Sequence, residues 1–86
     1  MKIFWSKNFH KQYKQLNLKN QDLVGKALEL FLKDPFDAKL RNHSLKGLYK
    51  GCNSIDAAFD LRIIFQQEKN YFVVVLLQVG THGQLY

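Results

Sequence analysis

The chain has 86 residues, so we expect residues 1–86 to form a single domain with one modest core. Hydrophobic residues make up 47% of the sequence, which excludes an intrinsically disordered chain. Lysine and arginine number 13 against 7 acidic residues. The resulting formal net charge of +6 favours an anionic partner, most often nucleic acid, then an acidic protein or an anionic membrane.

The single cysteine, Cys52, excludes an internal disulfide and a metal site built on several thiolates. One cysteine also suits a reducing compartment. The segment Met1–Lys7 becomes polar too soon for a signal peptide. We therefore expect a cytoplasmic protein that does not act at a membrane.

A short strand over Lys2–Trp5 is predicted to lead into the first helix. The hydroxyl of Ser6 can cap this helix by accepting a hydrogen bond from a free amide of the first turn. Phe9, Tyr13 and Leu16 follow at helical spacing and form one apolar stripe. This stripe indicates the face that packs in the core.

The residues 17–20 are predicted to form a turn, with Asn20 capping a second helix over Gln21–Asp34. Leu23, Ala27, Leu30 and Phe31 share one face of it. Pro35 cannot continue a helix and disfavours helical geometry at the residue before it. The two helices with their short connection indicate an antiparallel hairpin packed on a sheet.

An irregular segment over Phe36–Lys50 follows the helices. A connection this long in a small domain is more often functional than idle. It is strongly basic and contains one histidine; these residues are Lys39, Arg41, Lys46, Lys50 and His43.

Three strands are predicted after this segment, over 51–58, 61–67 and 71–79, with a three-residue hairpin loop at 68–70 between the last two. If Gln67 faces Tyr71, then Phe65 faces Val73 and Ile63 faces Val75. We expect these apolar residues, with Leu61 and Leu77, to face the helices. Counting the same register brings four polar residues to the far end of the sheet, namely Asp56, Asp60, Arg62 and His82.

Three blocks of the second half resemble the RelE/ParE superfamily of bacterial toxins, in particular its YafQ-like ribonuclease branch. The blocks are Leu40-Arg41-Asn42-His43-Ser44-Leu45-Lys46-Gly47, Asp60-Leu61-Arg62-Ile63-Ile64-Phe65, and Gly80-Thr81-His82 with Leu85-Tyr86. The resemblance implies an α+β fold of order βααβββ, with a helical hairpin on a mainly antiparallel four-stranded sheet. It also implies a type II toxin that cleaves translated mRNA at the ribosome, needs no metal or other cofactor, and is inhibited by a cognate antitoxin.

Metal-free RNA cleavage uses the 2′-hydroxyl as nucleophile and needs a base, an acid and cations around the phosphate. The resemblance assigns His82 as the general acid and His43 as a second active-site histidine. It assigns Asp60 to orient a histidine or to act as base. Asp56 stands where the branch often carries a histidine. If that histidine is the base, Asp56 could replace it, as a weaker base.

Arg62 is expected to hold the scissile phosphate, and the alternative is a surface ion pair with Asp60. The basic residues Lys39, Arg41, Lys46 and Lys50 are expected to contact RNA phosphates. Tyr86 either stacks on a base or packs the C-terminus.

Two other functions remain open, and Asp56 in place of a histidine motivates the first of them. One is a toxin that acts by binding, either a ParE-like gyrase inhibitor or a homologue with impaired catalysis. The other is a basic nucleic-acid-binding module in which the histidines are incidental. In the toxin cases, we expect the antitoxin to be acidic, because it must cover a basic surface.

Overall fold

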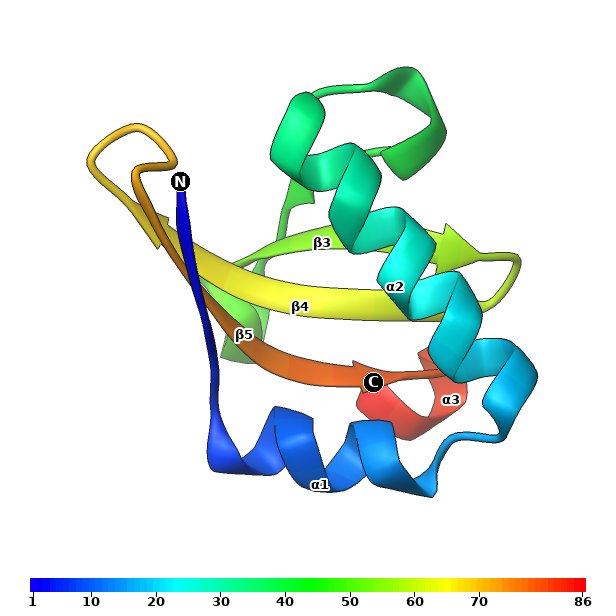
Figure 1. The fold of residues 1–86 in the computed structure, drawn as a ribbon. Coiled ribbons are helices and arrows are strands. Elements are labelled where there is room, and N and C mark those ends of the chain that lie inside the picture. Colours follow the sequence, from blue (N-terminus) through cyan, green and yellow to red (C-terminus); the bar gives the residue numbers. More distant parts are fainter.

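Three antiparallel strands from the second half of the chain form the centre of a five-stranded mixed sheet. The computed structural model describes all residues from 1 to 86. The strand order is β1-β5-β4-β3-β2, and only β1 and β5 run parallel. The elements in chain order are β1 (Lys2–Trp5), α1 (Lys7–Gln15), α2 (Leu18–Lys33), η1 (Ala38–Leu40), β2 (His43–Ser44), η2 (Gly47–Tyr49), β3 (Asn53–Ala58), β4 (Leu61–Glu68), β5 (Val73–Gly80) and α3 (His82–Leu85) (Figure 1).

The predicted order of elements is confirmed, with one more strand than the four expected. The additional strand, β2, lies inside the segment predicted to be irregular and pairs His43 with Ser54 of β3. Two residues give too short a pattern to identify a strand from sequence. None of the helices is long and apolar enough to cross a membrane.

The helical hairpin begins as predicted but its second helix starts earlier. Ser6 caps α1 by accepting a hydrogen bond from the amide of Phe9 at 3.0 Å. The prediction that Asn20 caps α2 is wrong, because the side chain of Asn17 accepts from the amide of Asn20 at 2.8 Å. Both residues are asparagines, three positions apart, and asparagine is a common helix cap. The residue type therefore did not show which of the two caps the helix. The helix ends at Lys33, just before the predicted stop at Asp34.

The predicted register between β4 and β5 is wrong by several residues. Ile63 pairs with Val79 rather than Val75, and Phe65 pairs with Leu76 rather than Val73. One reason is the connecting loop, which extends through residue 72 and contains three consecutive non-glycine residues with positive φ, at 69–71. The other is a bulge beside Ile64 and Phe65, which adds one residue to β5.

The new register changes which residues of β5 face the helices. Val74, Leu76 and Val79 join the main core, whereas Val73, Val75 and Leu77 were expected there. The predicted inward residues of β4 are correct; they are Leu61, Ile63 and Phe65.

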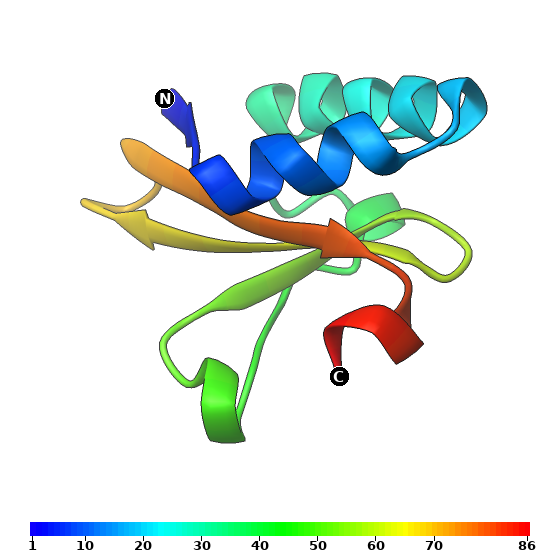
Figure 2. The same ribbon diagram turned by 90° about the horizontal axis from the view of Figure 1, so that it is seen from below.

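The sheet separates two apolar clusters of different size. The larger cluster has 12 buried residues and lies between the sheet and the two long helices. The smaller one, on the opposite face, contains Cys52, Ile64 and Leu85, with Leu77 and Tyr49 packed against it. Figure 2 shows α1 and α2 on one side of the sheet and α3 with the η2 loop on the other. The predicted polar end of the sheet therefore lies beside α3.

Candidate active site

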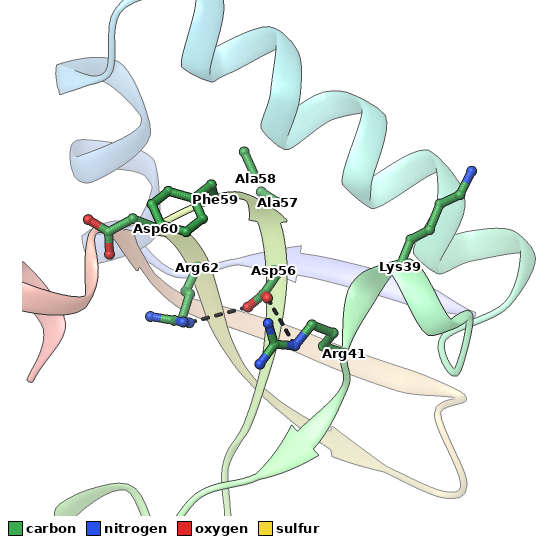
Figure 3. Close-up of a pocket in the computed structure, with 8 residues that line it drawn as sticks. All are labelled: Lys39, Arg41, Asp56, Ala57, Ala58, Phe59, Asp60 and Arg62. Carbon is green, nitrogen blue, oxygen red and sulfur yellow. Dashed lines mark hydrogen bonds and ion pairs between the residues drawn. The ribbon is translucent and has the colours of Figure 1, made fainter.

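An open hollow of about 610 Å³ lies where β3 turns into β4 (Figure 3). Its lining comes from the η1 segment and from the two strand ends; the residues are Lys39, Arg41, Asp56, Ala57, Ala58, Phe59, Asp60 and Arg62. Three of these side chains are cationic and two are carboxylates. Such a lining suits a phosphate group, which binds guanidinium and ammonium groups.

Two arginines converge on one carboxylate at the centre of this hollow. Asp56 and Arg62 are opposite one another on β3 and β4, and their side chains approach to 3.2 Å. Arg41 reaches the second carboxylate oxygen of Asp56 at 3.5 Å. We call Arg41, Asp56 and Arg62 the arginine clamp. The alternative partner predicted for Arg62 was Asp60, and the structure corrects it to Asp56 because cross-strand neighbours point to the same face.

Arg41 holds its place through an unusual backbone conformation. Its φ of 50° lies in the left-handed region, which a non-glycine residue adopts only when its surroundings impose it. The buried Leu40 anchors one side of this turn. On the other side, Nδ1 of His43 lies 2.8 Å from the carbonyl oxygen of Arg41. The turn therefore directs Arg41 towards Asp56 and ties His43 to the same segment.

Asp60 ties the backbone of His82, at the start of α3, to the hollow. The carboxylate of Asp60 accepts a hydrogen bond from the backbone amide of His82 at 3.1 Å. Thr81 and Gln84 add a reciprocal capping box, with bonds of 2.9 Å and 3.2 Å. A Cβ at Gly80 would lie 2.9 Å from the Gln84 amide oxygen, which explains the glycine.

The imidazole of His82 packs against the last aromatic residue. The rings of His82 and Tyr86 have centroids 4.7 Å apart, and Tyr86 meets Tyr49 edge-to-face at 5.6 Å. The Tyr49 hydroxyl donates to the carbonyl of Leu85 at 2.8 Å and accepts from the Gln78 side chain at 3.0 Å. Tyr49 therefore ties the C-terminal turn to the sheet.

The structure brings the predicted polar end together. Asp56, Asp60 and Arg62 line one hollow, and the amide of His82 contacts Asp60. Lys39 and Arg41 also line the hollow. Outside the lining lie the exposed side chains of His82, His43, Lys46, Lys50 and Tyr86. No group of three or more histidine, cysteine, aspartate or glutamate residues lies close enough together to hold a metal ion.

Sequence reasoning overlooked two residues at the site. Phe59 falls between the strands predicted over 51–58 and 61–67, yet it lines the hollow and is fully exposed. An aromatic residue in a turn was the available signal, since turns favour Gly, Asn, Asp, Ser and Pro. Tyr49 gave no such signal, because its partners Gln78 and Leu85 lie about thirty residues away.

Several solved structures share this fold, among them YafQ and other bacterial toxins. YafQ from Escherichia coli strain BL21(DE3) superimposes with a TM-score of 0.83 at 19% identity, covering 99% of this chain and 97% of that one. A YoeB/ParE toxin from Agrobacterium tumefaciens gives a TM-score of 0.77 at 16% identity, covering 95% and 99%. A metal-bound toxin from Helicobacter pylori gives 0.76 at 28% identity, covering 100% and 99%.

The family comparison covers the whole chain. Residues 1–86 match the family model described as a bacterial toxin of a type II toxin–antitoxin system, YafQ. The protein therefore belongs to the YafQ toxin family, as the three sequence blocks had indicated. No curated protein matches the sequence.

Proposed function

We propose that this toxin is an endoribonuclease that cleaves translated mRNA in the cytoplasm, at the ribosome, through attack by the RNA's own 2′-hydroxyl. The observation that carries the proposal is the position of His82, whose backbone amide is bonded to Asp60, a residue that lines a hollow with two arginines. A titratable imidazole next to a phosphate-binding group is the arrangement that such cleavage requires.

The reaction proceeds without a metal in this proposal. A base takes the proton of the 2′-hydroxyl, whose oxygen attacks the adjacent phosphorus. The bond to the 5′-oxygen breaks, and His82 as imidazolium gives that oxygen its proton. The products are a 2′,3′-cyclic phosphate and a 5′-hydroxyl end. Arg62 and Arg41 stabilise the negative charge that gathers on the phosphorane oxygens.

The geometry supports His43 as the base more than Asp56. A carbonyl oxygen can only accept, so the contact between His43 and the Arg41 carbonyl places the imidazole proton on Nδ1. Nε2 is then the nitrogen that is free to take a proton. Both carboxylate oxygens of Asp56 are engaged by arginines. Asp56 is therefore better placed to position Arg41 and Arg62 than to accept a proton.

A cognate antitoxin is the second partner that we propose. The Escherichia coli DinJ–YafQ structure is a toxin–antitoxin complex, and its YafQ-containing chain shares this fold with a TM-score of 0.72. The net charge of +6 calls for an acidic partner that covers the basic hollow.

The test is induction of the toxin in translating bacteria, with the wild type compared with His82→Gln. We expect His82→Gln to lose mRNA cleavage by about 10²–10⁴-fold, since it lacks the general acid. His10→Gln is the matched control, because His10 is an exposed histidine on α1 and is expected to leave cleavage unchanged. Equal cleavage by the wild type and His82→Gln would remove His82 from the mechanism.

A toxin that binds without cleaving is the second candidate. It is favoured by the carboxylate at position 56, which is held by two arginines instead of being free to act as base. This function would be supported if the wild type and His82→Gln both arrest growth while cellular mRNA stays uncleaved.

A further inference from the structure

The ring of Phe59 is fully exposed and lines the same hollow as the arginine clamp. Single apolar residues on a surface are normal and need no explanation. Phe59, however, is 101% exposed and forms part of the wall of a hollow that contains Lys39 and the arginine clamp. It lies in a two-residue turn, between the paired residues Ala58 and Leu61, where its type has no conformational advantage. Neither folding nor turn geometry accounts for it.

Figure 3 shows the arrangement of the hollow. The Phe59 ring stands at the rim beside Asp60, and the guanidinium groups of Arg62 and Arg41 lie on either side of Asp56. The two arginines are held by side-chain ion pairs, and Arg41 also by its left-handed backbone. Both guanidinium groups are therefore directed towards Asp56 before any ligand arrives, and the side chain of Arg62 is 23% exposed against 73% for Arg41. Such preorganisation lowers the entropy lost on binding.

An exposed ring beside fixed cations matches the two halves of a nucleotide. Single-stranded nucleic acids bind through backbone phosphates on basic residues and through bases stacked on aromatic side chains. A protein partner would use an exposed phenylalanine as an anchor in a desolvated apolar pocket, with charge depleted around it. Phe59 is instead surrounded by charged side chains, so the surroundings favour RNA.

We propose that Phe59 and the arginine clamp form a subsite for one nucleotide of single-stranded RNA, with the base stacked on Phe59 and its phosphate held by Arg41 and Arg62. The proposal rests on the proposed function for the identity of its ligand. It adds a substrate contact that none of the histidines makes, and it gives Asp56 the task of positioning the arginines.

The experiment measures binding of a 2′-O-methylated single-stranded oligonucleotide to the full chain across a range of salt concentrations. Methylation removes the nucleophile, so the measurement does not depend on cleavage. We expect Phe59→Leu to weaken binding by about 5- to 100-fold with the salt dependence unchanged, because stacking involves no charge. Arg41→Gln is expected to lower the slope of log K against log salt by about 0.7, the contribution of one phosphate contact on a single strand.

Phe59→Trp keeps the aromatic ring and adds a reporter. We expect it to bind as tightly as the wild type and to lose part of its indole fluorescence when the oligonucleotide stacks. The wild type, whose single tryptophan is Trp5, gives the background. Trp5 packs against α1 residues and lies beside Lys7, Lys11 and Lys14, so quenching that both proteins show is assigned to Trp5.

Phe72→Leu is the matched control. Phe72 is also exposed, at 53%, and lies in the hairpin loop near Lys2 at the opposite end of the sheet. An affinity of Phe59→Leu within twofold of the wild type, or an equal loss in Phe72→Leu, would overturn the proposal. If either result is found and cleavage still depends on His82, the proposed function is unaffected. If Phe59→Leu weakens binding while the wild type itself does not cleave RNA, the subsite stands and the ribonuclease function is rejected.

Discussion

Asp60 shows how a single residue connects the turn with the site. Its φ of 56° is a conformation that aspartate and asparagine tolerate better than most residues. Its carboxylate also satisfies the amide of His82, which would otherwise lack a partner at the start of α3. The sequence left two roles open for Asp60, as base or as a residue that orients a histidine. The geometry supports the second role, acting through the backbone of His82.

Replacement of Asp60 separates these two roles. Asn retains an acceptor oxygen and the same backbone preference, so we expect Asp60→Asn to cleave RNA within about threefold of the wild type. Asp60→Gly relieves the backbone but removes the acceptor, and we expect it to cleave about 10- to 100-fold more slowly because His82 is misplaced. Cleavage rates of both variants on one RNA substrate provide the measurement. Were Asp60 the base, both variants would lose activity alike.

Several single residues were predictable because their effect is local. Ser6 caps α1 through its own hydroxyl, and Pro35 stops α2 through its own ring. The Asp56–Arg62 pair was not predictable to the same degree. It depends on cross-strand register, and Asp60 is the nearer carboxylate in the chain.

At the scale of elements, the bulge in β5 determines what lies under α3. The additional residue turns Leu77 towards the smaller apolar cluster, and Gln78 reaches the hydroxyl of Tyr49 on the same side. That hydroxyl in turn holds the carbonyl of Leu85. The C-terminal helix has only four residues and cannot be stable alone, so its position depends on these contacts.

Tyr49→Phe tests this attachment. The variant removes one acceptor and one donor and leaves Gln78 and Leu85 without their partner. We expect the free energy of unfolding to fall by about 1–2 kcal/mol, and cleavage to fall with it as His82 loses its fixed position. Urea unfolding and a cleavage assay measure the two effects. Tyr13→Phe serves as the comparison, since its half-buried ring on α1 has no hydroxyl contact in the structure, and a similar loss there would count against the attachment.

At the scale of the whole molecule, the sheet divides the basic surface into two sides. The α2 lysines, including Lys19 and Lys33, lie on the helical side. Lys46 and Lys50 flank the η2 turn on the other side, which also carries α3 and the site (Figure 2). The net charge of +6 raises the rate of encounter with RNA in general. In the proposed complex with RNA, we expect Lys46 and Lys50, and not Lys19 and Lys33, to contact the bound strand.

Two double variants with the same net charge distinguish these lysines. Each double variant loses two positive charges, so its formal net charge falls from +6 to +4. For Lys46→Gln with Lys50→Gln, we expect the slope of log K against log salt to fall by about 0.7 per lysine. For Lys19→Gln with Lys33→Gln, we expect little change. Binding isotherms of the 2′-O-methylated oligonucleotide provide the slopes, and equal slopes for the two variants would show that net charge alone decides binding.

The sequence by itself determined the class of elements, their order and most of the residues at the site. Periodicity of apolar residues, caps and helix-stopping residues act over a few positions, so they can be read along the chain. Only the tertiary structure decided the register of β4 with β5, the partners of Arg62 and the task of Tyr49. The register of β4 with β5 depends on a four-residue loop with three left-handed residues and on a bulge, and the pairing of β3 with β4 places Asp56 opposite Arg62. A shift of one residue in a strand turns every side chain to the other face.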